Sequence, residues 1–340
     1  MPGLISLRAP AFWWKKPGLA ATLLAPLGAV YGGFAAQRMK RPGYRANIPV
    51  ICIGNPTLGG AGKTPAAIAV AKLLQERGRK PFFISRGYGG NAAGPLRVDP
   101  EKHTAGDTGD EALLLAATAP TIIGADRAAS AKLAESLGAD VLVMDDGFQN
   151  PSLEKDLSIL VVDGERGIGN EKVFPAGPLR APLPIQLAQA HVMVAAGAGT
   201  GGQRALSAAI LANLAVLSAV IAPGEAAVAA LRGKPLLAFA GIGFPEKFFA
   251  TLERNDLRVA ERRAFPDHHR FSAADAAALI TSAERGGLTL VTTEKDFARM
   301  GGDPALRELR EKSKTLPVAL AFDDTAEIGG FIDEALARKR

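Results

Sequence analysis

The sequence predicts an α/β fold in which a parallel sheet carries helices on both faces. Two observations support this fold class. Short apolar runs alternate with segments of helical periodicity along most of the 340 residues. Two of the runs end in polar residues typical of the carboxyl edge of a parallel sheet. Glycines with Lys63 and Thr64 follow one run, and Asp145 with Asp146 follows another.

Length and composition leave room for a sizeable core and two domains, because 48% of the residues are apolar. The net charge of +6 would suit nucleic acid, an anionic membrane surface or simple solubility, so the position of the charges decides. Cys52 is the only cysteine, which excludes an internal disulfide and suits a reducing compartment. One cysteine and four histidines form no zinc-spacing cluster.

Residues 1–45 differ from the rest of the chain. An uncharged stretch, 17–37, follows Trp13 and Trp14 and has basic residues on both sides. We predict a retained helix that lies in the membrane interface on anionic lipid, and we expect no nucleic-acid partner. A spanning helix and an ordinary core helix are the alternatives. The length just permits a span, but Pro26 interrupts it and basic residues flank both ends.

Residues 48–65 predict a phosphate-binding loop. The run 48–53 is typical of a buried strand and residues 66–75 have helical spacing, so the glycines lie between a strand and a helix N-terminus. Free backbone N–H groups there would bind phosphate, with Lys63 on the β/γ-phosphates and the Thr64 hydroxyl on Mg²⁺. Thr57 replaces the first glycine of the usual motif, so a glycine-rich turn without a ligand is the alternative. The predicted nucleotide-binding residues are Thr57, Gly59, Gly60, Ala61, Gly62, Lys63 and Thr64.

In the stretch 139–149, four apolar residues predict a central strand that ends in Asp145 and Asp146, a Walker B pattern. A carboxylate at this position holds Mg²⁺ directly or through water, and alternation along a strand lets one of the two face the metal. An acidic turn is the alternative. Further strands are expected at 81–85, 121–124, 158–163 and 191–195, with a helix at 125–137.

Two loops beside these strands carry polar residues. Arg86 and Tyr88 stand among glycines, which suits an anionic or sugar-bearing ligand or, alternatively, a hairpin with an exposed arginine. Asp107 or Thr108 precedes a helix rich in Ala and Leu and is a simple N-cap candidate.

A flexible boundary is expected at 197–202, after which strands and helices alternate again. These later elements are expected at 214–221, 236–241, 244–254, 257–263, 272–285, 288–292, 318–322 and 327–338. The sequence thus predicts a membrane-associating segment (1–45), a P-loop domain (46–200) and a smaller α/β domain (201–340). In the last, Asp267 beside His268 and His269 forms either a surface turn or a carboxylate-held acid/base group.

Seven motifs in order resemble the tetraacyldisaccharide 4′-kinase family, the lipid A kinases. They are GNPTLGGAGKTP (54–65), SRGYGG (85–90), GDE (109–111), DDGFQ (145–149), FPAGPLR (174–180), DH (267–268) and TTEKD (292–296). The resemblance covers nearly the whole chain, and Thr57 is typical of the family loop. Ala181 departs from the family pattern, in which an acidic residue follows Pro-Leu-Arg.

The resemblance implies an enzyme that transfers the γ-phosphoryl group of ATP to the 4′-hydroxyl of tetraacyldisaccharide 1-phosphate, a lipid A precursor. It implies ATP and Mg²⁺ as cofactors, action at the cytoplasmic face of the Gram-negative inner membrane, and an anionic membrane surface as partner. Closure of the smaller lobe over the nucleotide would assemble the site.

The resemblance also implies residue roles. Asp110 is expected to take the proton of the acceptor hydroxyl with His268 as its partner, and Lys63 completes the catalytic set. Mg²⁺ is expected on Thr64 and Asp146. The acceptor is expected near Ser85, Arg86, Tyr88, Asp145 and Gln149, and the adenosine near Thr293, Glu294 and Lys295.

Three other classes of protein are alternatives to a lipid kinase. A partner-switching ATPase recruited to the membrane has a similar loop, but with a second lysine where this chain has Leu58. A GTPase would need an Asn-Lys-x-Asp clamp, which residues 294–296 do not match. A nucleotide-gated membrane adaptor would bind ATP without an acceptor.

Overall fold

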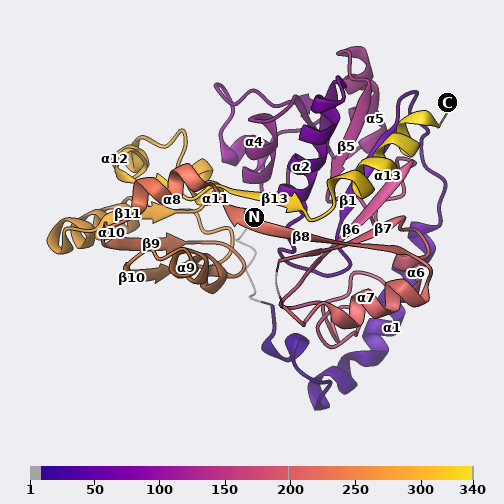
Figure 1. Cartoon of the computed structure of the whole chain (residues 1–340), viewed down its shortest axis with the longest axis horizontal. Helices are drawn as coiled ribbons and strands as arrows, with labels where there is room; N and C mark the ends of the chain where they lie inside the picture. The colour runs from indigo at the N-terminus through magenta and orange to yellow at the C-terminus, as the bar shows by residue number, and fades with distance from the viewer. Residues whose placement is uncertain (1–8, 198, 339–340) are drawn as a thin grey trace.

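The computed structural model describes residues 9–197 and 199–338, which form two α/β lobes of different size (Figure 1). The larger lobe holds a nine-stranded sheet in the order β13-β8-β7-β6-β1-β5-β2-β4-β3. Seven neighbouring strands run parallel, and β13 and β3 pair antiparallel at the two edges. The strands are β1 (Val50–Gly54), β2 (Pro81–Ser85), β3 (Leu96–Arg97), β4 (Thr121–Ile123), β5 (Val141–Asp145), β6 (Leu157–Asp163), β7 (Val192–Ala196), β8 (Ala215–Pro223) and β13 (Val318–Phe322).

Helices cover both faces of this sheet, as the sequence predicted. Alternation along β1 sends Ile51 and Ile53 into one core and Val50 and Cys52 into the other, so its whole apolar run is buried. The first core is closed by α2 (Lys63–Glu76), α4 (Asp110–Ala116) and α13 (Thr325–Ala337). The second is closed by α5 (Arg127–Ser136), α6 (Leu183–Leu187) and α7 (Gln203–Leu211). The short α3 (Ala105–Thr108) precedes α4.

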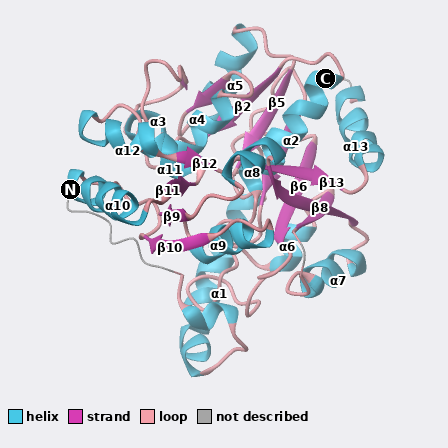
Figure 2. Cartoon of the chain, turned by 60° about the vertical axis from the view of Figure 1, so that its left-hand side comes forward, coloured by secondary structure: helices cyan, strands magenta, loops and turns pink. Residues whose placement is uncertain are grey.

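The smaller lobe has its own parallel sheet in the order β10-β9-β11-β12 (Figure 2). Its strands are β9 (Leu236–Ala240), β10 (Val259–Ala264), β11 (Thr289–Thr292) and β12 (Lys314–Thr315). Its helices are α8 (Glu225–Leu231), α9 (Pro245–Arg254), α10 (Ala273–Gly286), α11 (Glu294–Arg299), η2 (Pro304–Leu306) and α12 (Arg307–Lys312). Leu236 packs with α8 and α9 on one face, and Leu237 with α10 and α12 on the other.

The division between the lobes corrects the boundary expected after residue 200. The strands β8 and β13 both belong to the larger sheet, where Val318 pairs with Pro223 and Phe322 with Ala219. The small lobe is therefore an insertion between these strands, and residues 201–223 and 318–338 lie with the larger lobe. The apolar pattern of each strand does not show which of the two sheets it joins, because that depends on pairing with strands that are distant in the sequence.

The N-terminal segment begins with η1 (Ala11–Trp14) and continues as α1 (Leu19–Met39); residues 1–8 lie outside the described part. One narrow stripe of α1 packs on the larger lobe, where a Cβ on Gly28 would stand 2.8 Å from the Val173 carbonyl. The opposite surface is apolar and exposed at Leu19, Leu23, Leu27, Val30, Tyr31 and Phe34. This exposure is not that of an ordinary core helix.

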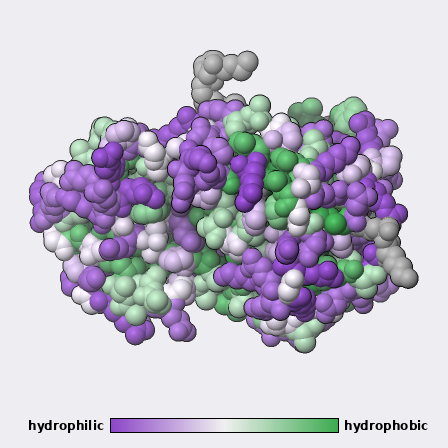
Figure 3. All heavy atoms as spheres, turned by 90° about the horizontal axis from the view of Figure 1, so that it is seen from above, coloured by the Kyte–Doolittle hydropathy of each residue, from purple (hydrophilic) through white to green (hydrophobic). Residues whose placement is uncertain are grey.

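Within the described residues, α1 is the one helix long and apolar enough to cross a membrane. In an apolar 18-residue window of this 21-residue helix, 17% of the window is buried. By contrast, the face of the molecule shown in Figure 3 is mostly hydrophilic, with apolar surface confined to smaller areas. The exposed apolar side of α1 fits a membrane-associating helix.

Candidate active site

The phosphate-binding loop joins β1 to α2 in the predicted order of strand, glycines and helix. Gly59 and Gly62 have φ angles of 108° and 87°, in the left-handed region that favours glycine. The buried Asn55 donates its amide to the Gly59 carbonyl at 3.2 Å and so fixes the turn. The loop therefore presents backbone N–H groups at the N-terminus of the 14-residue α2, an arrangement suited to phosphate.

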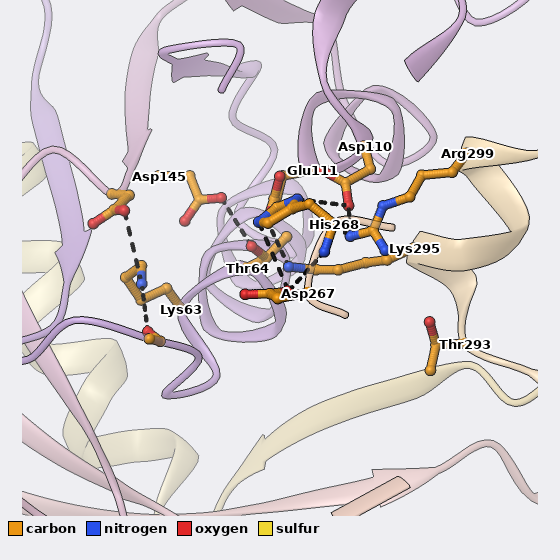
Figure 4. Close-up of polar contacts among 12 residues, drawn as sticks. Lys63, Thr64, Asp110, Glu111, Asp145, Asp267, His268, Thr293, Lys295 and Arg299 are labelled. Atoms are coloured by element: carbon orange, nitrogen blue, oxygen red, sulfur yellow. Dashed lines mark hydrogen bonds and ion pairs between the residues drawn. The ribbon is translucent and has the colours of Figure 1, made fainter. Parts of the chain in front are cut away.

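The loop meets the two acidic residues at the end of β5. The Thr64 hydroxyl donates to Asp145 Oδ2 at 3.0 Å, and Lys63 Nζ lies 3.8 Å from Asp146 Oδ2 (Figure 4). Asp146 has a positive φ of 56°, which turns it away from the strand direction. Among the described atoms, Asp145 Oδ1 is buried without a hydrogen-bond partner. Thr64 thus contacts Asp145, whereas the sequence analysis had paired Thr64 with Asp146.

The pKa values of Asp145 and Asp146 are shifted in opposite directions because different charges lie next to them. Burial raises the pKa of Asp145 to about 6, and the charges of Asp146 and Glu111 add to the effect. For Asp146 burial acts in the same direction, but the cations Lys63 and Arg180 outweigh it and hold the pKa below its ordinary value. Burial also lowers the pKa of Lys63.

Arg180 is a site residue to which the sequence analysis gave no role. Its guanidinium bonds Asp146 Oδ1 at 3.0 Å, and its Nε donates to the Thr57 carbonyl at 2.8 Å. It therefore ties the proline-rich segment 174–184 to both the phosphate loop and the acidic pair. The only sequence signal was its place at the end of the FPAGPLR motif. The next residue, Ala181, is fully buried.

A second group of polar residues forms where the lobes meet. Asp110, the first residue of α4, is 3% exposed, and its Oδ2 lies 3.9 Å from His268 Nδ1. His268 follows β10, so the structure brings together the predicted pair from two lobes (Figure 4). Burial, with a contribution from Glu111, raises the pKa of Asp110 to about 6. The N-cap alternative concerned Asp107 and Thr108, but neither residue is an N-cap. Asp107 is the third residue of a capping box that Thr104 begins at α3, and Gly109 is the N-cap of α4.

The loop after β2 lies beside this group. Tyr88 is 64% exposed and packs edge-on against the His268 ring, with 5.4 Å between centroids. A Cβ on Gly109 would stand 2.3 Å from the Tyr88 carbonyl, so only glycine lets the loop approach α4 this closely. Ser85 is buried at the end of β2, and Arg86 is exposed next to it. Tyr88 thus lines solvent-accessible surface beside the Asp110–His268 pair, and Arg86 is exposed two residues before it.

Two other predicted residues have contacts that differ from their expected roles. Gln149, expected near the acceptor, donates its amide to the Asn55 carbonyl at 2.8 Å and to Gln186 Oε1 at 2.9 Å, so it braces the phosphate loop from behind. Lys295, expected near the adenosine, pairs with Glu111 Oε1 at 2.7 Å. The residues next to Gln149 and Lys295 in the sequence do not predict these contacts.

The other members of the TTEKD motif serve the structure around them. Thr293 caps α11 by accepting from the Asp296 N–H at 3.2 Å, and Glu294 accepts from the Val318 N–H at 3.3 Å. Arg299, which the sequence analysis missed, ends α11 and pairs with both Asp110 and Asp296. The smaller lobe therefore contributes a cation, the Arg299 guanidinium, that contacts Asp110 directly.

The arrangement combines an anion-binding helix terminus, a lysine, paired carboxylates and a buried carboxyl group with a raised pKa beside a histidine. Such a combination suits phosphoryl transfer to a hydroxyl. The unpartnered Asp145 oxygen and the Thr64 hydroxyl are hard oxygen donors, which fit Mg²⁺.

Comparison with known proteins identifies the family. The family model described as tetraacyldisaccharide-1-P 4′-kinase matches residues 20–337. The tetraacyldisaccharide 4′-kinase of Nitrobacter winogradskyi is 50% identical over 334 residues, which cover 98% of this chain and 99% of that protein. The one from Xanthobacter autotrophicus is 54% identical over 337 residues, 98% of each chain.

A solved structure agrees on the fold. The crystal structure of LpxK from Aquifex aeolicus, described as an "apo" form in complex with ATP, has a TM-score of 0.73 to this chain at 23% identity. The match covers 94% of this chain and 100% of the Aquifex aeolicus chain. On the strength of the family model and the two relatives, the chain belongs to the tetraacyldisaccharide 4′-kinase family.

Proposed function

We propose that this protein transfers the γ-phosphoryl group of ATP to the 4′-hydroxyl of tetraacyldisaccharide 1-phosphate in lipid A biosynthesis. The observation that carries the proposal is the position of the Asp110–His268 pair beside the phosphate loop in a family member (Figure 4). Glu111, the neighbour of Asp110, interacts electrostatically with Asp145, which accepts a hydrogen bond from Thr64 of the loop. A loop alone would bind nucleotide. A buried general base next to the loop can accept the proton of an acceptor hydroxyl.

In this mechanism the loop N–H groups and Lys63 hold the phosphates and stabilise the charge that develops on the transferred group. Asp110 accepts the proton of the acceptor hydroxyl as it attacks in line. A pKa of about 6 leaves Asp110 largely ionised at neutral pH yet more basic than an ordinary carboxylate. His268 orients it, and Arg86 and Tyr88 contact the acceptor.

Thr64 and Asp145 are the residues best placed to hold Mg²⁺, because they touch each other and one Asp145 oxygen has no partner among the described atoms. Bound Mg²⁺ would neutralise phosphate charge in the transition state. Asp146 then keeps Lys63 and Arg180 in place.

The acceptor is a lipid, so the site must work at a membrane. We place the exposed apolar side of α1 in the cytoplasmic leaflet of the inner membrane, with Lys15, Lys16, Arg38, Lys40 and Arg41 toward anionic headgroups.

The test is transfer of labelled γ-phosphate from ATP to tetraacyldisaccharide 1-phosphate by the purified full chain in detergent micelles. Labelled lipid bearing a 4′-phosphate is the expected product. A partner-switching ATPase would release labelled phosphate without labelling the lipid, and a nucleotide-gated adaptor would do neither. Either result would reject the proposal.

A further inference from the structure

Arg299 is buried between the lobes, where it makes ion pairs in two directions. Its side chain is 7% exposed. Within the smaller lobe, Nη1 donates to the Gly241 carbonyl at 2.6 Å and to Asp296 Oδ1 at 2.7 Å. Toward the larger lobe, Nη2 pairs with Asp110 Oδ2, and the same nitrogen lies 3.4 Å from Nδ1 of His268 in the smaller lobe. One guanidinium thus touches both members of the proposed proton-accepting pair (Figure 4).

The anchor for Arg299 is rigid. Asp296 is fully buried, and its Oδ2 accepts from the Gly241 N–H at 3.1 Å and from the Thr293 hydroxyl at 2.7 Å. A carboxylate held at several points fixes the planar fork of the guanidinium, and the fork then sets the direction of the remaining N–H groups. The position of Nη2 is therefore imposed by the smaller lobe.

We propose that Arg299 is a positioning residue for phosphoryl transfer, which orients the Asp110 carboxylate and His268 when the smaller lobe docks on the larger one. The proposal rests on the proposed function, because it takes Asp110 as the base. Asp110 starts a helix of the larger lobe, whereas Arg299 and His268 belong to the smaller lobe. The base is then complete only in the docked arrangement, which links proton acceptance to lobe position.

The charges that face Asp110 explain why a cation is needed there. Glu111 of α4 opposes ionisation of Asp110, as does burial, whereas Arg299 and Lys295 of α11 favour it. His268 faces Asp110 from the loop after β10. Lys295 is paired with Glu111, so Arg299 is the cation in direct contact with the Asp110 carboxylate. Its removal should leave a carboxyl group that protonates more easily and is free to rotate.

The experiment compares Arg299→Ala and Arg299→Lys with a control, Lys247→Ala. Lys247 makes another ion pair between the lobes, with Asp163 at 2.8 Å, on α9 and away from Asp110. We expect Arg299→Ala to lower kcat about 10- to 100-fold, the scale of a charged hydrogen bond, with a smaller change in the KM for ATP. Its acid limb of kcat should move to higher pH, and guanidinium ion should restore part of the rate. Lys247→Ala should retain kcat and the acid limb.

The outcomes separate this inference from the proposed function. If Asp110→Asn is inactive while Arg299→Ala keeps the wild-type kcat and acid limb, Arg299 has no positioning role. If Arg299→Ala does not fold by circular dichroism, Arg299→Lys decides, since an ammonium group cannot span both carboxylates. A several-fold loss of kcat in the folded Lys variant supports the proposal, and an unchanged kcat overturns it. An Asp110→Asn enzyme of full activity would instead remove Asp110 as the base.

Discussion

Replacing Asp110 with Asn removes the proposed base and leaves its shape. The amide is isosteric with the carboxylate but cannot take a proton. General-base catalysis typically contributes about 10²- to 10⁴-fold, which corresponds to roughly 3 to 5 kcal/mol of the barrier. We therefore expect Asp110→Asn to lower kcat by that factor.

The surroundings of Asp110 indicate that the variant will fold and bind nucleotide. Arg299 keeps Asp296 at 2.7 Å and the Gly241 carbonyl at 2.6 Å, so its charge stays paired when Asp110 becomes neutral. The stability cost should be about 1.5 to 3 kcal/mol, the range for a hydrogen bond to a charged group. The ion-pair partners of Asp110, Arg299 and His268, lie in the smaller lobe rather than in the phosphate loop. ATP affinity should therefore stay close to that of the wild type.

The assay is steady-state kcat with the lipid acceptor, measured beside ATP affinity for Asp110→Asn, His268→Ala and the double variant. Loss of the orienting histidine should reduce kcat less than loss of the base. The double variant should lose far less than the product of the single losses, because residues that act as one unit are non-additive. Full activity of folded Asp110→Asn would refute the assignment of the base.

Three further outcomes are expected. Because burial raises the pKa of Asp110 to about 6 and its ionised form is the active one, kcat should fall about tenfold per pH unit below pH 6; an acid limb near pH 4 would contradict this. Lys63→Ala should raise the activation barrier by several kcal/mol and so nearly abolish turnover. Lys72→Ala, at an exposed position on the same helix, should stay active. Near-normal turnover of Lys63→Ala would reject the phosphate-loop assignment. Leu23→Glu on the exposed side of α1 should weaken binding to anionic vesicles, whereas Leu137→Glu, at an exposed position directly after α5, should not. Equal binding by the two variants would argue against α1 as the anchor.

The sequence predicted those parts of the site that are encoded locally. The phosphate loop depends on a strand, glycines and a helix that follow one another in residues 50–76, and the structure places Gly59, Gly62 and Lys63 accordingly. The pairing of Asp110 with His268 came from the family resemblance, since no spacing rule links residues 158 positions apart. Arg180 and Arg299 were missed because their roles arise only when segments that are distant in the sequence meet in the fold.

Side-chain partners were also hidden from sequence where the residue type fits several roles. Gln149 has an amide that suits a sugar as well as a backbone carbonyl, and only the fold directs it to Asn55. Lys295 has a charge that suits phosphate as well as carboxylate, and the docking of α11 on α4 gives it Glu111. The sheet membership of β8 was likewise a matter of long-range pairing.

The insertion of the smaller lobe between β8 and β13 has a consequence for biosynthesis. The last described helix, α13, buries Ile328 and Ile332 against the same core as Ile51 and Ile53 of β1. That core includes the strand leading into the phosphate loop, so it stays incomplete until α13 has left the ribosome. The smaller lobe, whose residues are contiguous, can fold earlier. The nucleotide site should therefore mature only after α13 has been synthesised, and a nascent chain that stops before residue 318 should lack β13 and α13 at this core.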